Sequence, residues 1–329
     1  MAAVAEAIDV GERPPRIGII DTARGLALLA MASYHFTWDL EFFGYLMPGT
    51  VETGWLRIYA RAIAATFLFL VGVSLVLAST PEIRWNAYLK RLGMVAGAAA
   101  LITIATRIGM PDEFIFFGIL HCIAAASIIG LPFLRLPLVL VWLAAAALLG
   151  AVVVDGWLYP NILQSTFFDS WWLYWLGFSA TPPRSNDFVP LFPWLTPFLL
   201  GLAIARTGLW LGWSRRLASL GTGSSLVAKA GRHSLIIYLV HQPFLFGCVY
   251  LLSLVAPAPP PDPVQSYLYQ CRASCMMQEG EPICRSFCQC TLDKLQAQDL
   301  FTPLQSGAIQ ANNDERVQSI AVECTTIAQ

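Results

Sequence analysis

Three ionisable side chains stand on one apolar stretch of the chain, residues 24–39, with the sequence RGLALLAMASYHFTWD. Arg24 begins the stretch, and His35 and Asp39 lie near its end. At about 100° and about 1.5 Å per residue, Arg24 and His35 share one helix face but lie about 16 Å apart along the axis. The spacing therefore predicts two separate polar sites on one helix rather than a single charge pair.

The two sites suit different chemistry. Asp39, four residues after His35, could accept a hydrogen bond from one imidazole nitrogen and leave the other nitrogen as a general base. Arg24 is a permanent cation whose fork of donors suits a phosphate or a carbonyl group, and Asp21 precedes it on the same stripe. The alternative is structural: Arg24 pairs with Asp21 near lipid headgroups, while His35 and Asp39 lie in the opposite membrane interface. The spacing leaves both interpretations open.

The composition is that of a membrane protein. Of the 329 residues, 57% are hydrophobic and 12% are charged, and the mean hydropathy is +0.61. Soluble domains carry about 25% charged residues, and a bilayer crossing needs about 20 apolar residues. We expect an all-α, polytopic transmembrane bundle of about seven spans, near residues 17–38, 57–79, 89–108, 114–133, 136–155, 190–208 and 234–255. The net charge of −1 says nothing about nucleic acid, but no basic cluster or stacking motif supports such a partner, so none is expected.

Lys and Arg residues predict the orientation of these spans. With residues 1–16 as a cytoplasmic segment, eleven basic residues fall on the cytoplasmic side and four in the opposite loops. Cytoplasmic loops carry the excess of Lys and Arg, so the N-terminus is expected inside and the C-terminus outside. One outer loop holds an aromatic-rich stretch at 167–178, which favours either membrane-surface anchoring or the wall of a substrate cleft.

The C-terminal part differs in composition. A proline-rich linker at 256–266 separates the predicted membrane domain, 17–255, from a polar helical module at 267–329. This module holds six cysteines: Cys271, Cys275, Cys284, Cys288, Cys290 and Cys324. Two pairs at i, i+4 predict a helical hairpin joined by Cys271–Cys288 and Cys275–Cys284, with Cys290–Cys324 as a third bridge, among the 15 pairings that six cysteines allow. Zinc is the less favoured alternative, because the module lacks histidine, and no metal is expected. Disulfides need an oxidising compartment, which agrees with the predicted outside location.

Ionisable residues inside spans are costly, so each is a functional candidate. His121, in the fourth predicted span, has apolar sequence neighbours and is either a satisfied buried histidine or an active-site group. Arg232 and His233 begin the seventh predicted span and suit an anionic cytosolic ligand or lipid headgroups. His241, beside a predicted proline kink, is a candidate for lining a cavity.

The stretch IDTARGLALLAMASYHFTWDLEFFGY (20–45) has an arginine, ten residues and then a histidine. It resembles the first helix of the acyltransferase-three family of sugar O-acetylating membrane enzymes. Together with DFVPLFPWLTPFLLG (187–201) and GRHSLIIYLVHQP (231–243), it resembles more closely the bacterial branch of the heparan-α-glucosaminide N-acetyltransferase-like family. The resemblance covers about residues 16–255 and leaves the cysteine module out.

The resemblance implies transfer of an acetyl or other acyl group across a bacterial inner membrane. Cytosolic acetyl-CoA would donate to an amine or hydroxyl of an extracytoplasmic sugar, with the tail in the periplasm. Arg24 would face the donor, His35 would act as base or transient acyl carrier, Asp39 would orient His35, and Asp187 would line the cleft. The alternative function is a non-catalytic membrane subunit whose module 267–329 docks on a protein partner. A transporter or proton relay is a weaker third hypothesis, because no internal repeat supports it.

Overall fold

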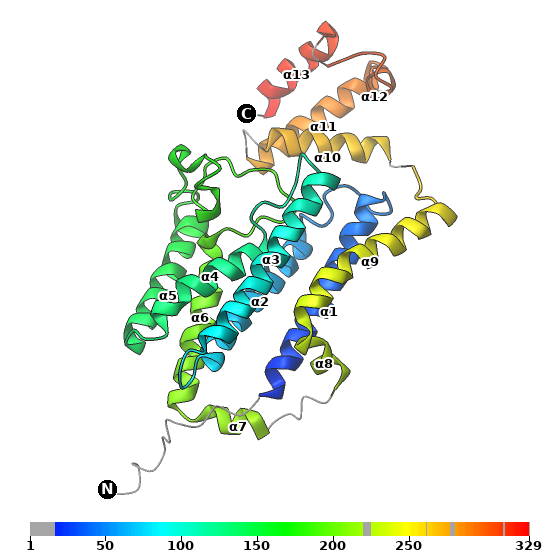
Figure 1. The fold of residues 1–329 in the computed structure, drawn as a ribbon. Helices are drawn as coiled ribbons and strands as arrows, with labels where there is room; N and C mark the ends of the chain where they lie inside the picture. The colour runs from blue at the N-terminus through cyan, green and yellow to red at the C-terminus, as the bar shows by residue number, and fades with distance from the viewer. Residues whose placement is uncertain (1–16, 220–224, 261, 277–279, 312, 329) are drawn as a thin grey trace, which may run out of the picture. The chain divides into compact units, whose positions relative to one another are not determined.

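The computed structural model describes residues 17–219, 225–260, 262–276, 280–311 and 313–328 (Figure 1). The predicted cytoplasmic segment 1–16 lies outside the described residues. Within the described residues the secondary structure is helical and no strand forms, which confirms the predicted all-α class.

The apolar part of the chain consists of long helices joined by shorter elements. In chain order these are α1 (Gly18–Phe42), α2 (Gly54–Ala78), α3 (Trp85–Gly109), α4 (Ile119–Phe133), α5 (Leu138–Val153), the π-helix η1 (Val154–Leu158), the 3₁₀ turns η2 (Thr166–Phe168) and η3 (Tyr174–Leu176), α6 (Leu191–Trp210), α7 (Trp213–Ser219), α8 (Leu226–Arg232) and α9 (Ser234–Val255).

A helix corresponds to each of the seven predicted spans. Five helices among the described residues are long and apolar enough to cross a membrane: α2, α3, α5 together with η1, α6 and α9. α1 is 25 residues long but carries several charged side chains, and α4 has only 15 residues. The structure thus supports a multi-pass membrane protein, while the number of spans and their orientation stay predictions.

Large apolar side chains on the surface fit a lipid environment. Ile108 is 80% exposed, and Trp157 and Val255 are each 86% exposed. A soluble protein rarely leaves large contiguous apolar patches in water, whereas lipid tails solvate such side chains at no cost.

The aromatic stretch 167–178 forms turns rather than a long helix. Asp169 organises these turns, because its Oδ1 accepts hydrogen bonds from Ser179 Oγ at 2.6 Å and from the Thr181 amide at 3.1 Å. Trp171 stacks on Phe114 with ring centroids 5.8 Å apart. This segment is therefore held by contacts with the residues that follow it and with Phe114, and the choice between membrane anchor and cleft wall stays open.

The chain divides into two compact units, which are described separately. The first comprises the residues up to Ser33 together with Ile58–Pro243, and the second comprises Tyr34–Arg57 and Phe244–Gln329. In the first unit, fully buried side chains of α2, α5 and α6 form a core, joined by residues of α4; the largest are Leu68, Val141, Phe198, Leu199 and Leu202. This core sets the positions of α2 and α4, which carry parts of the site below.

In the second unit, the polar tail forms α10 (Pro263–Cys275), α11 (Glu281–Ala297), α12 (Phe301–Gln305) and α13 (Glu315–Ala328). The three disulfides are those predicted: Cys271–Cys288 and Cys275–Cys284 join α10 to α11, and Cys290–Cys324 joins α11 to α13. A small core that includes Leu295, Leu300 and Ile320 fills the module. A module of this size buries few apolar side chains, so the disulfides supply part of its stability.

Candidate functional site

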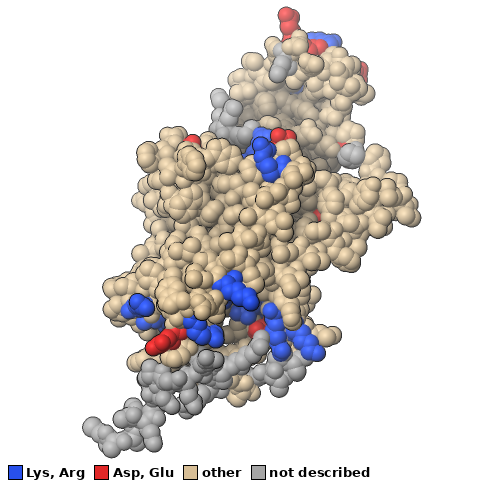
Figure 2. All heavy atoms as spheres, in the orientation of Figure 1, with Lys and Arg blue, Asp and Glu red and all other residues tan. Residues whose placement is uncertain are grey.

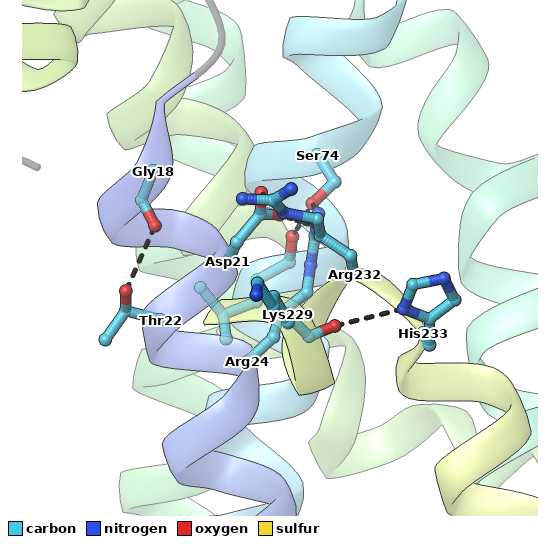
Figure 3. Close-up of polar contacts among 9 residues, drawn as sticks. Gly18, Asp21, Thr22, Arg24, Ser74, Lys229, Arg232 and His233 are labelled. Atoms are coloured by element: carbon cyan, nitrogen blue, oxygen red, sulfur yellow. Dashed lines mark hydrogen bonds and ion pairs between the residues drawn. The ribbon is translucent and has the colours of Figure 1, made fainter. Parts of the chain in front are cut away.

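Four polar side chains from three helices meet near the N-terminal end of α1 (Figure 3), and we call Asp21, Arg24, Ser74 and Arg232 the Asp21 cluster. Asp21 Oδ1 accepts a hydrogen bond from Arg24 Nη1 at 3.1 Å, and Asp21 Oδ2 lies 3.6 Å from Arg232 Nε. Arg24 Nη2 also donates to the Ser74 hydroxyl on α2. The Asp21 side chain is only 7% exposed, so one buried carboxylate forms ion pairs with two arginines. The predicted Asp21–Arg24 pair is confirmed.

Two glycines let α8 approach α1 closely enough to form this cluster. A Cβ atom on Gly231 would lie 1.8 Å from the Asp21 carbonyl oxygen, and one on Gly25 would lie 2.0 Å from the Val227 carbonyl oxygen. Any larger residue at either position would separate the helices. The close approach brings Arg232, the last residue of α8, within reach of Asp21.

A cavity of about 170 Å³ lies between α2, α3 and α4. Its walls are mostly apolar, and two arginines contribute the charge: Arg84, the residue before α3, and Arg91 within α3. Neither guanidinium group forms an ion pair or hydrogen bond with any residue that the structure describes, and Arg91 lies within electrostatic range of Arg24. Lys and Arg side chains gather at this end of the first unit, where α7 and α8 also lie (Figure 2).

The C-terminal end of α1 carries His35 and Asp39, and both belong to the second unit. Asp39 is fully buried, and His35 is half-buried with its ring 5.9 Å from that of Tyr34 in an edge-on arrangement. The two residues lie one turn apart on the same helix face, as their spacing predicts. A buried carboxylate beside a partly accessible imidazole is the arrangement that a general base requires, although the pairing itself stays a prediction.

His121 occupies a different position from the one expected. The predicted span began at residue 114, but α4 begins at Ile119, so His121 lies in the first turn rather than deep in an apolar helix. His121 Nδ1 accepts a hydrogen bond from the Gly118 amide at 3.2 Å, and Nε2 lies 3.2 Å from Thr103 Oγ1. The Thr103 hydroxyl donates to the Ile115 carbonyl, so Nε2 carries the proton that Thr103 accepts. Both ring nitrogens are thus engaged, which favours the structural interpretation of His121.

Asp187 caps the same helix. Its Oδ2 accepts a hydrogen bond from the Ile119 amide at 2.9 Å, at the end of α4 where backbone N–H groups lack helical partners. Burial raises the pKa of the Asp187 carboxyl to about 6, against the opposing effect of the Ile119 hydrogen bond. The sequence named Asp187 and His121 separately as cavity residues, and the structure joins them at one helix N-terminus.

The remaining two histidines bond to backbone carbonyls. His233 Nδ1 donates to the Lys229 carbonyl at 3.1 Å (Figure 3), and His241 Nδ1 donates to the Tyr238 carbonyl at 2.7 Å. Because a carbonyl only accepts, Nδ1 carries the proton in both rings. α9 continues through Pro243, so no break in the helix occurs beside His241.

Comparison with protein families decides the class. The model of the family described as heparan-alpha-glucosaminide N-acetyltransferase, catalytic, matches residues 16–243. The chain belongs to this family. Comparison with curated proteins and with solved structures returned no match.

The part that matches the N-acetyltransferase family contains the Asp21 cluster, the cavity, His35, Asp39, Asp187 and the first residues of α9. The disulfide module begins after the matched region. The family match indicates a membrane acetyltransferase. The family result agrees with the resemblance found in the first helix.

Several residues of the site escaped the sequence-based prediction. Arg84 and Arg91 entered the prediction only through the count of basic residues that gives the orientation. Ser74 and Thr103 lie in apolar helices and were not predicted as site residues. A signal for the two arginines existed, because they lie seven residues apart and so share one face of α3. Nothing in the sequence showed that this face borders a cavity.

Proposed function

We propose that this protein transfers an acetyl or related acyl group from cytosolic acyl-CoA to an amine or hydroxyl group of an extracytoplasmic sugar. The family match supports acetyl transfer at a membrane. The observation that carries the donor half of the proposal is the cavity between α2, α3 and α4, bordered by two guanidinium groups that form no ion pair or hydrogen bond with the described residues.

Arg84 and Arg91 are better suited to the donor than Arg24. Arg24 and Arg232 already share Asp21, so each of them has an ionic partner within the protein. The guanidinium groups of Arg84 and Arg91 form no ion pair with any residue that the structure describes, and such groups match phosphate oxygens in geometry and charge. The cavity is smaller than the roughly 300–1,000 Å³ of sites that enclose a whole ligand. It would therefore hold the phosphate-bearing part of coenzyme A, and His233 is a further candidate contact for the donor.

His35 is the candidate base for the acceptor. It would remove the proton from the sugar hydroxyl or amine as the oxygen or nitrogen attacks the thioester carbonyl. A new C–O or C–N bond forms, the C–S bond breaks, and coenzyme A leaves as the thiolate, which the proton neutralises. Alternatively His35 attacks the thioester first and passes the acyl group on. In both routes Asp39 stabilises the charge that develops on the imidazole.

The experiment is acyl transfer by the full chain reconstituted in vesicles, with labelled acetyl-CoA outside or inside and an amino-sugar oligosaccharide as the acceptor probe. We expect His35→Ala to reduce transfer by about 10²–10⁴-fold, the usual contribution of a general base. The affinity for coenzyme A, measured by equilibrium binding, should stay unchanged because His35 serves the acceptor.

Phe36→Ala is the matched control, since Phe36 is the next residue on α1 and is exposed. His35→Gln keeps the size and polarity of the side chain, so it separates loss of the base from loss of the fold. Wild-type levels of transfer in both His35 variants would refute the proposed role. Absence of any coenzyme A binding by the wild type would refute the donor half.

A further inference from the structure

The disulfide module makes a close contact with the turn that follows α1. Residues 43–53 connect α1 to α2, and we call them the 43–53 turn. Gly49 in this turn has φ +80°, and the ring of Tyr269, on α10, lies against it. A Cβ atom on Gly49 would lie 1.9 Å from Cε2 of that ring. The contact therefore exists only because residue 49 has no side chain.

Two further contacts join the same segments. The Tyr45 hydroxyl donates a hydrogen bond to the Ala256 carbonyl at 2.5 Å, and an added Cβ on Gly44 would meet the Ala258 side chain at 3.6 Å. Burial, together with the negative charges of Glu52 and Glu41, raises the pKa of the Tyr269 hydroxyl. These observations describe an interface between the 43–53 turn and the chain that leads into the module.

The two faces of α10 have different partners. Tyr267 and Tyr269 are two residues apart, so they point to nearly opposite sides of the helix. The Tyr267 hydroxyl donates to Thr291 Oγ1 at 2.9 Å, and its ring meets Phe301 edge-on, both within the module. Disulfide Cys271–Cys288 fixes α10 on α11, which leaves the Tyr269 face directed at the 43–53 turn.

The 43–53 turn is in turn fixed to the C-terminal end of α1. Glu41 Oε1 accepts a hydrogen bond from the Gly49 amide at 2.5 Å, and its Oε2 accepts one from the Val51 amide at 2.8 Å. The Tyr34 hydroxyl donates to the Val51 carbonyl at 3.4 Å. Tyr34 and Glu41 flank His35 and Asp39 on α1, so the turn bonds to the helix on both sides of the candidate catalytic pair.

We propose that the disulfide module is an intramolecular clamp that docks on the 43–53 turn through Tyr269 and so fixes the end of α1 that carries His35 and Asp39. Tyr269 is then a positioning residue for the acceptor side of the reaction. The catalytic consequence rests on the proposed function, whereas the docking does not. A protein partner of the module would have to use another face.

Hydrogen exchange on the full chain tests the docking without any assay of activity. Gly49→Ala places a methyl group in the Tyr269 ring and should accelerate amide exchange in residues 43–53 and 34–42 by about tenfold. Gly44→Ala is the matched control, because Gly44 has nearly the same φ, +81°, but an added Cβ there meets only an ordinary contact. It carries the same backbone strain without the clash, so its acceleration should be several-fold smaller.

Tyr269→Ala removes the ring instead and should accelerate exchange in the same peptides, whereas Tyr269→Phe should behave as wild type. In the Tyr269→Ala background, Gly49→Ala should add no more than Gly44→Ala does, because the clash is gone. Intact disulfides in each variant, mapped without reduction, show that the module itself is folded. Unchanged exchange in residues 43–53 of Tyr269→Ala with intact disulfides would overturn the docking, and unchanged exchange in 34–42 would overturn the positioning of α1.

The transfer assay then separates positioning from a structural role. Tyr269→Ala should raise KM for the acceptor or lower kcat several-fold while leaving the affinity for coenzyme A unchanged, and Tyr269→Phe should restore both. Unchanged acceptor kinetics alongside faster exchange would overturn the catalytic role of the clamp. A wild type that transfers no acyl group would refute the proposed function, and exchange would still decide the docking and the hold on α1.

Discussion

Two pairs of arginines in the first unit differ in how their charge is balanced. Arg24 and Arg232 meet at a single buried carboxylate, Asp21, and Arg24 has Ser74 as a further partner. Arg84 and Arg91 border a cavity and form no ion pair or hydrogen bond among the described residues. All four lie in or beside apolar helices, so residue type and hydropathy do not distinguish them.

The difference indicates which cations remain for a ligand. Arg24 and Arg232 are partly buried and share one carboxylate, whereas Arg84 and Arg91 are exposed at the edge of the cavity and form no ion pair among the described residues. The second pair can be balanced by an anion from solution, such as a phosphate group. The Asp21 cluster is therefore the structural element, and the α3 arginines are the better candidates for binding.

We expect the largest effect when the two arginines that border the cavity are replaced. Arg84→Ala/Arg91→Ala should weaken binding of coenzyme A by about 100-fold, because each charged hydrogen bond contributes about 1.5 kcal/mol. The melting temperature should stay close to that of the wild type, since both side chains are exposed and neither forms an ion pair or hydrogen bond with the described residues. Equilibrium binding and thermal unfolding in detergent measure the two quantities. Lys90→Ala, a neighbouring cation of α3 that does not line the cavity, is the control. If the double variant bound coenzyme A with wild-type affinity, Arg84 and Arg91 would not be the donor-binding arginines.

The next largest effect is a loss of stability when the ion pairs of Arg24 and Arg232 are removed. Asp21→Asn removes the carboxylate that Arg24 and Arg232 share and should destabilise the fold by about 2 kcal/mol. This is below the cost of unmasking fully buried charges, because the two arginine side chains are 25% and 32% exposed. Thermal unfolding measures the loss, and Glu82→Gln, at an exposed carboxylate, is the control. If Asp21→Asn instead weakened coenzyme A binding without a loss of stability, the Asp21 cluster would be part of the donor site.

The smallest effect concerns a carboxyl group with no cationic partner among the described residues. The pKa of Asp187 is about 6 in the folded protein and about 3.9 when unfolded, so the folded state binds more protons between these values. Stability should therefore fall as the pH rises from about 4 to 6, by about 1 kcal/mol once solvent screening of this half-buried group is included. Asp187→Asn should flatten this slope, measured by thermal unfolding across the pH range. An unchanged slope would show that another group titrates.

Local features of the fold could be predicted from the sequence. Seven apolar runs correspond to seven helices, and the i, i+4 cysteines led to the three observed disulfides. Both follow from helical periodicity and from the size of the apolar runs. The start of α4 was misplaced by five residues because its capping carboxylate, Asp187, lies far along the chain. Periodicity cannot register a cap that comes from another segment.

The sequence by itself determined the helical membrane class, the disulfide hairpin and the separation of Arg24 from His35, because rise and rotation per residue are local properties of a helix. The tertiary structure decided which arginines share a carboxylate, since Arg232 of α8 reaches Asp21 and Ser74 of α2 bonds to Arg24. It also brought Tyr269 against Gly49 across more than 200 residues of chain. These pairings depend on how helices pack, and packing is a property of the whole fold.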